Sequence, residues 1–247
     1  MNNTVSKSIL AGAAMLGMVA GAQAVTFNFS GTSGSNGQAL AATAEFLISG
    51  TTVTIKVTNT GAAAANDGAN VLGGVYFNLA SARTFSNGNA ALGSGANLVK
   101  KNDNSNQSGN PLNNEWMWNT NIVSTGGQSN FNAGYGIGAT GFNFSPNNST
   151  FNEVFYGGNV MAGANDDYGL VPTLGMTAGN QSNLYMRNQA VFTFTVNSTF
   201  SEADITSAYT SWGSAGQSVI TGSAVPEPAS MAALGLGLAA LLRKRRK

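Results

Sequence analysis

The sequence predicts an all-β fold, an antiparallel β-sandwich of the jelly-roll type with one short helix in its body. Apolar and polar residues alternate with a period of two in several segments, as they do in strands with one buried face. The 32 Gly and 31 Asn residues supply the turns that join many short strands. Helical periodicity is short everywhere except at the two ends of the chain.

Five segments of the body carry the strand pattern. They are residues 25–30, 44–48, 52–59, 71–79 and 189–196. Residues 44–48 and 52–59 flank a Ser-Gly-Thr turn, so they are predicted to form a hairpin. In its second arm, Val53, Ile55 and Val57 are expected to face the core.

One helix is predicted in the body, at residues 201–209. Ser201 supplies a hydroxyl N-cap, and Glu202 and Asp204 place acids in the first turn, where the helix dipole favours them. The helix is expected to continue through residues 205–209.

Three polar segments are predicted to lie outside regular strands. Residues 102–114 are expected to be a long surface loop or partly disordered, and residues 124–148 a loop with short strands. Residues 213–224 are small and polar, which favours a linker between a β-sandwich body at 25–212 and a membrane.

The first 24 residues have the pattern of a signal peptide. Lys7 precedes an apolar helix at residues 9–21, and Ala22 and Ala24 form the small-residue pattern before Val25. Cleavage by a signal peptidase is therefore expected between Ala24 and Val25, after export.

The C-terminal end combines prolines, an apolar helix and a basic tail. Pro226 and Pro228 precede residues 229–242, which carry no charge. As a helix these 14 residues span about 21 Å, less than the roughly 30 Å of a bilayer core. Basic side chains extend that span and place the tail in the cytoplasm, with the body outside. The last five residues form this tail: Arg243, Lys244, Arg245, Arg246 and Lys247.

This end resembles a PEP-CTERM sorting signal, here residues 225–247. The resemblance rests on Val225-Pro226-Glu227-Pro228, the apolar segment and the basic end. It implies recognition of Pro226, Glu227 and Pro228 by an exosortase, a cysteine-protease-like transpeptidase of the membrane, in a Gram-negative bacterium that makes exopolysaccharide and biofilm. The implied route is an inner-membrane intermediate with its body in the periplasm, followed by the cell surface or the extracellular matrix.

The composition excludes several kinds of chemistry. The chain has neither Cys nor His, so Ser-His-Asp and Cys-His nucleophilic sites are impossible and zinc sites are not expected. Between Val25 and Ala224 there are five basic and nine acidic residues, a net charge of −4. A mildly acidic body without a basic stripe argues against nucleic acid as a partner.

Two clusters in the body are candidate binding sites. Trp116 and Trp118 lie on one side of a predicted strand, where they would stack on sugars as a platform or fill the core. Asn165, Asp166 and Asp167 offer oxygen ligands to Ca²⁺, although an Asx turn explains them as well. No other metal or cofactor is expected.

The sequence therefore favours an exported surface or matrix protein with a structural or interaction role and no catalysis. One alternative is a secreted carbohydrate-binding module that uses the two Trp residues, with exopolysaccharide as its partner. The other is a secreted hydrolase that uses carboxylates, for which Glu45, Glu115 and Glu153 are available without a spacing that pairs them.

Overall fold

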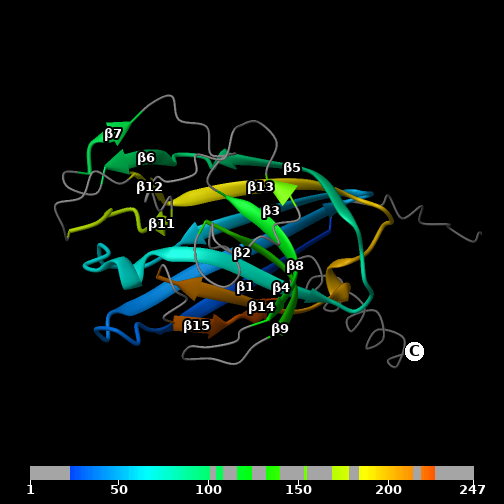
Figure 1. Ribbon diagram of the computed structural model, residues 1–247, viewed down its shortest axis with the longest axis horizontal. Helices are drawn as coiled ribbons and strands as arrows, with labels where there is room; N and C mark the ends of the chain where they lie inside the picture. Colours follow the sequence, from blue (N-terminus) through cyan, green and yellow to red (C-terminus); the bar gives the residue numbers. More distant parts are fainter. Residues whose placement is uncertain are drawn as a thin grey trace, which may run out of the picture.

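The computed structural model describes residues 23–100, 104–107, 116–123, 132–139, 153–154, 169–177, 184–213 and 218–225. These residues form strands arranged in two sheets, so the all-β prediction is confirmed (Figure 1). The predicted signal helix and C-terminal apolar helix lie outside them. None of the helices that the described residues form is long and apolar enough to cross a membrane.

The first sheet has six strands, and each neighbouring pair is antiparallel. In order they are β16 (Ser223–Val225), β1 (Gln23–Thr32), β2 (Ala39–Ser49), β3 (Thr52–Asn59), β13 (Gln189–Val196) and β5 (Phe85–Leu92). The predicted hairpin is confirmed as β2 and β3, whose turn contains Gly50 at a φ of 60°. Gly adopts this left-handed conformation without strain.

The second sheet is centred on β4 (Leu72–Leu79), which pairs with β9, β11 and β14. Its other strands are β10 (Glu153–Val154), β8 (Met117–Val123), β9 (Asn132–Gly138), β11 (Leu170–Val171), β12 (Leu184–Arg187), β6 (Asn97–Lys100), β7 (Asn106–Gln107), β14 (Ile205–Trp212) and β15 (Ser218–Thr221). Its pairs are antiparallel except for β11 with β12.

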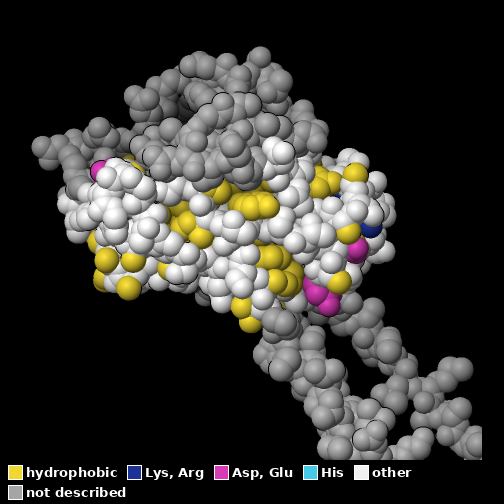
Figure 2. Space-filling model, turned by 90° about the horizontal axis from the view of Figure 1, so that it is seen from below, with side chains coloured by type: hydrophobic (Ala, Val, Ile, Leu, Met, Phe, Trp, Pro, Cys, Tyr) yellow, Lys and Arg dark blue, Asp and Glu magenta, His cyan; other side chains and the backbone are white. Residues whose placement is uncertain are grey.

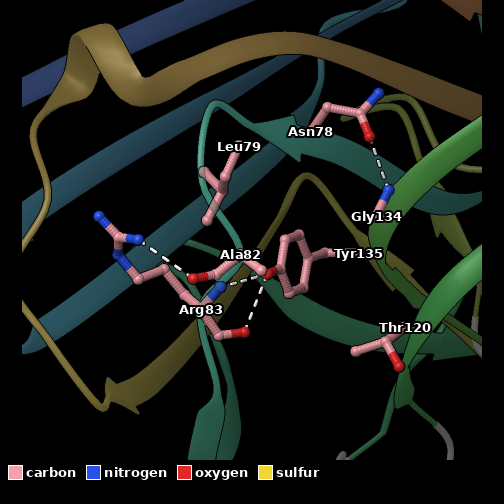
Figure 3. A pocket seen from close by; sticks show the side chains of 7 residues that line it. All are labelled: Asn78, Leu79, Ala82, Arg83, Thr120, Gly134 and Tyr135. Atoms are coloured by element: carbon pink, nitrogen blue, oxygen red, sulfur yellow. Dashed lines mark hydrogen bonds between the residues drawn. The ribbon is translucent and has the colours of Figure 1, made fainter.

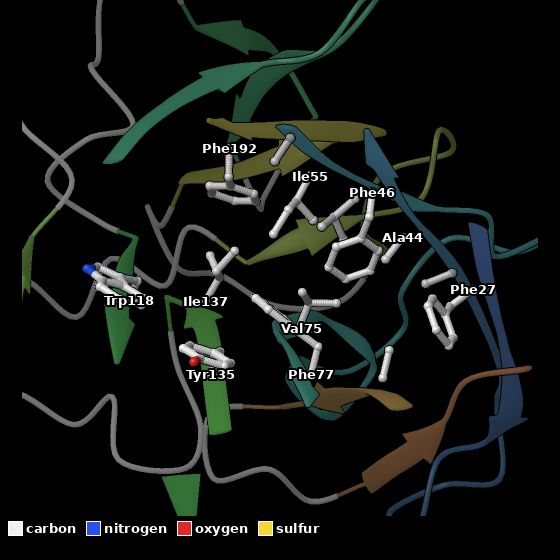
Figure 4. Packing of buried hydrophobic residues seen from close by; sticks show 14 of the residues in the cluster. Phe27, Ala44, Phe46, Ile55, Val75, Phe77, Trp118, Tyr135, Ile137 and Phe192 are labelled. Atoms are coloured by element: carbon white, nitrogen blue, oxygen red, sulfur yellow. The ribbon is translucent and has the colours of Figure 1, made fainter. Parts of the chain in front are cut away.

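The hydrophobic core fills the space between the two sheets (Figure 4). Phe46 of β2 lies between Phe27 of β1 and Phe77 of β4, with ring centroids 5.8 and 5.2 Å away in edge-to-face geometry. Such edge-to-face contacts add to the energy of burial. The inward faces expected from the alternation are confirmed by burial of Phe27, Phe29, Val53, Ile55, Val57, Phe192, Phe194 and Val196.

The chain crosses between the sheets at Asn188, which joins β12 to β13. Its φ of 77° makes the bend, and Asn tolerates this left-handed region better than most residues. Its N–H donates to the Val171 carbonyl at 3.0 Å, and its carbonyl accepts from the Asn59 N–H at 2.9 Å. The backbone groups of the corner are therefore satisfied inside the fold.

The helix predicted at residues 201–209 is wrong beyond its first turn. Ser201 is the N-cap as expected, and its N–H donates to the Asp204 carboxylate at 2.8 Å, but the two residues cap only a 3-10 turn, η3 (Glu202–Asp204). Ile205 begins strand β14, which pairs with β4 along its length. Sheet pairing and burial of Ile205 and Ala208 outweigh a short helical signal.

The linker predicted at residues 213–224 is also wrong. Residues 218–221 pair with β14 as β15, and residues 223–225 pair with β1 as β16. Ile220 is buried in the core, which anchors this part of the chain to the body. Strand pairing is made by backbone N–H and C=O groups, which small polar residues also have. The polarity of this segment was therefore not sufficient evidence for a linker.

The segment 102–114, predicted to lie outside regular strands, contains strand β7 at residues 106–107, which pairs with β6. Asn104, within the polar segment 102–114, has its side chain bonded to the backbone N–H and C=O of Met176, at 2.9 and 2.8 Å. Residues 132–138, within the segment 124–148, form β9, one of the short strands expected there.

Candidate functional site

The two ends of the body meet where β16 lies beside β1. Thr26 is opposite Val225, Phe27 is opposite Ala224, and Asn28 is opposite Ser223. Because the two strands are antiparallel, the beginning of β1 and the end of β16 lie at the same end of the sheet. The last described residue, Val225, therefore lies beside β1 three residues from the first, Gln23.

Gly222 places β16 at this edge, since it joins β15 in one sheet to β16 in the other. Its N–H donates to the Ala208 carbonyl at 2.8 Å. A Cβ atom at this position would lie 2.6 Å from Cε1 of the buried Phe29, so a larger residue would displace β16 from β1. The sheet crossing requires a glycine here because the backbone approaches the core closely.

The predicted signal-peptide cleavage site lies within β1. Ala24 is 6% exposed and pairs with Leu47, and Val25 pairs with Phe46, both in β2. In the uncut folded chain, the Ala24–Val25 bond is thus part of a paired strand. Ala22 lies outside the described residues.

Val225 is the one residue of the V-P-E-P motif that the structure describes, and 42% of its surface is exposed. It ends β16, and the chain passes directly into Pro226. The remaining motif residues and the basic tail at 243–247 lie outside the described residues.

Trp116 and Trp118 do not form an exposed sugar platform. Trp116 is 0% exposed and Trp118 is 5% exposed, and both belong to the main core. The Trp116 indole lies 4.9 Å from the ring of Phe192, and the Trp118 indole lies 5.6 Å from the ring of Phe194. Trp116 directly precedes β8 and Trp118 lies in it, and alternate residues of an extended chain point to the same side, so both indoles face β13 across the core.

The carboxylates considered for a hydrolase are not brought together in the described part of the fold. Glu45 forms an ion pair with Lys56 of the neighbouring strand, at 3.0 Å. Of Glu153 only the backbone is described, and Glu115 lies outside the described residues, as do Asn165–Asp167. Within the described ranges, no group of three or more acidic residues is placed to hold a metal ion.

A cleft of about 320 Å³ lies between β4, the β4–β5 loop, β8 and β9 (Figure 3). It is lined by Asn78, Leu79, Ala82, Arg83, Thr120, Gly134 and Tyr135. No local pattern indicated it, because these residues come from segments far apart in the sequence.

Tyr135 and Asn78 fix the walls of this cleft. The Tyr135 hydroxyl accepts from the Arg83 backbone N–H at 2.6 Å and donates to the Arg83 carbonyl at 2.8 Å. The Asn78 carboxamide oxygen accepts from the Gly134 N–H at 2.6 Å. Arg83 donates from Nη1 to the Ala82 carbonyl at 3.1 Å, while its buried Nε has no hydrogen-bond partner among the described residues. The hydrogen bonds of Tyr135 and Asn78 therefore tie the β4–β5 loop and β4 to β9.

Residues 224–247 match the family model of the PEP-CTERM protein-sorting motif. The chain carries a PEP-CTERM sorting motif. It is thus an exported protein, sorted by an exosortase-type enzyme after a membrane-anchored stage. Neither a comparison with curated proteins nor one with solved structures found a match.

The PEP-CTERM match begins inside the folded body. Ala224 and Val225 belong both to the motif and to β16, where they pair with Phe27 and Thr26. The matched motif is therefore continuous with an edge strand of the six-stranded sheet.

Proposed function

We propose that the mature protein is a non-enzymatic structural or interaction protein of the cell surface or the extracellular polysaccharide matrix, and that it needs no cofactor. The PEP-CTERM motif supports the destination. The described surface supports the role, because few charged side chains appear on the face seen in Figure 2. Such a surface suits hydrogen bonding to a neutral, hydroxylated partner.

The outer face of the six-stranded sheet is the surface that carries this proposal. Six threonines of β2, β3 and β13 point away from the core there, and we call this surface the threonine face: Thr43, Thr52, Thr54, Thr58, Thr193 and Thr195. The cross-strand register places Thr43 opposite Thr58, and Thr54 opposite Thr193. Neighbouring strands lie about 4.8 Å apart, so these hydroxyls form cross-strand pairs.

The threonine face is close to neutral. Glu45 and Lys56 lie on it and neutralise each other in their ion pair. Gln189 donates from its carboxamide to the Thr58 hydroxyl at 2.9 Å, which fixes the orientation of both side chains. A neutral array of groups that both donate and accept suits hydrogen bonding to the hydroxyls of a polysaccharide chain. We infer that any contact with exopolysaccharide is made here and not through the buried Trp residues.

This proposal is tested by measuring binding of the mature protein to the extracellular polysaccharide of the bacterium that produces it. The variant Thr54→Glu/Thr58→Glu places two charges on the threonine face and is expected to reduce binding at least tenfold. The control Thr173→Glu/Thr177→Glu adds the same charge at two exposed positions elsewhere and is expected to bind like the wild type. An absence of wild-type binding, or equal binding by the two double variants, would remove the proposal.

The sorting assignment has a separate test. Replacement of Pro226, Glu227 and Pro228 by Ala is expected to leave the C-terminal tail attached and the protein in the membrane fraction. Intact mass and cell fractionation measure both effects. Normal tail removal and normal surface display in this variant would contradict recognition of the P-E-P residues.

A further inference from the structure

Two residues belong both to the matched sorting motif and to a strand of the folded body. Ala224 and Val225 are the first two residues of the motif match, and they are also two of the three residues of β16. Enzymes that read a peptide in extended form bind its main-chain N–H and C=O groups. While β16 is paired with β1, part of the backbone around the motif is already engaged.

The spacing between the body and the membrane segment is short. Pro226, Glu227 and Pro228 alone separate the end of β16 from the apolar segment that begins at Ala229. Three extended residues span at most about 11 Å. A folded body with β16 in place therefore lies directly against the membrane surface, with little room for an enzyme at the motif.

Strand β16 is also the least firmly held strand of its sheet. It has three residues, its side chains are all exposed, and it lies at the edge of the sheet. Little apolar surface is lost when such a strand separates, because exposed side chains contribute little to burial. Gly222, just before it, provides a point at which the backbone can turn. Release of β16 would add about another 11 Å of extended chain.

We propose that β16 must separate from β1 before the exosortase-type enzyme can act, so that detachment of this strand controls removal of the tail. This inference rests on the sorting function of the motif. It assigns Ala224 and Val225, the first two residues of the motif match, as a recognition segment that pairing with β1 keeps from the enzyme. The residues of β1 opposite them, Thr26 and Phe27, then compete with the enzyme for their backbone groups.

A disulfide across the two strands tests the proposal. Asn28 and Ser223 are opposite each other and both exposed, and Cα atoms of such pairs lie within the range that a disulfide spans. The chain has no Cys of its own, so Asn28→Cys/Ser223→Cys introduces a single pair. The matched control is Thr43→Cys/Thr58→Cys, which links β2 to β3 and leaves β16 free.

Tail removal in the full chain is followed by intact mass after export, with and without a permeant reductant. The oxidised β1–β16 pair is expected to keep its tail and to lose it once reduced. The β2–β3 pair and the two single variants are expected to be processed like the wild type. Tail removal from the oxidised β1–β16 pair at the wild-type rate would overturn the proposal.

Two further measurements distinguish failure of this inference from failure of the sorting function and from misfolding of the disulfide variant. If the wild type itself keeps its tail, the sorting function fails and this inference fails with it. If the disulfide variant does not fold, Ser223→Pro provides the opposite test, because it weakens β16 pairing outside the matched motif. This variant is expected to lose its tail faster than the wild type, and an unchanged or slower rate would overturn the proposal.

Discussion

The substitution Tyr135→Phe removes one oxygen atom from the fold and leaves its aromatic ring. That oxygen makes two hydrogen bonds to the Arg83 backbone, at 2.6 and 2.8 Å. Each is worth about 1 kcal/mol net, so the free energy of unfolding is expected to fall by about 2 kcal/mol. The ring keeps its contacts with Phe77 and Phe85, whose centroids lie 5.3 and 4.9 Å away. For a body of this size, the loss corresponds to a decrease in Tm of roughly 4–8 °C.

Urea unfolding of the mature protein measures this loss, with Arg83→Ala as the control. Since Tyr135 bonds the backbone of Arg83 and not its side chain, the control is expected to lose less than about 1 kcal/mol. The reasoning is refuted if Tyr135→Phe unfolds at the wild-type urea concentration. It is also refuted if the control loses as much stability as the Tyr135 variant.

Three other substitutions test the packing and the surface. Gly136→Ala places a Cβ 2.7 Å from the ring of the buried Tyr76, so urea unfolding is expected to show a free energy of unfolding lower by about 1–3 kcal/mol. The control Gly134→Ala lies on the same strand, and its Cβ comes no closer than 3.5 Å to another atom. It is expected to unfold like the wild type. Trp118→Ala empties a core position and is expected to cost about 3–5 kcal/mol, and a variant of wild-type stability would argue that the indole is not in the core. Glu45→Gln breaks an ion pair whose side chains are about one-third exposed, so calorimetry is expected to show a change below about 1 kcal/mol, and a larger loss would contradict a surface pair.

Local alternation of apolar and polar residues was sufficient to predict those strands that bury one face. The β2–β3 hairpin shows this, because Val53, Ile55 and Val57 alternate with Thr and Lys residues along the same strand. An alternation with a period of two involves only adjacent residues, so it can be recognised without knowing how the rest of the chain folds. The hairpin turn is equally local, since Gly50 takes the positive φ that it requires.

Prediction failed where a distant strand decided the outcome. The prediction of Ser201 as an N-cap was correct, but the residues after the turn pair with β4 and form a strand instead of a helix. Trp116 and Trp118 fitted a surface platform as well as a core, and only the position of β13 opposite them places the indoles inside. The sequence did not predict the cleft beside Arg83, because its walls come from three separate segments.

The sequence by itself determined that this protein is exported and sorted, since V-P-E-P, the apolar segment and the basic tail form one continuous signal. It also determined the all-β class, through alternation and turn residues. Only the tertiary structure decided that the segment before the motif is a strand and not a linker. Backbone hydrogen bonds between β1 and β16 join opposite ends of the chain, and such pairing depends on the whole fold and not on the residues nearby.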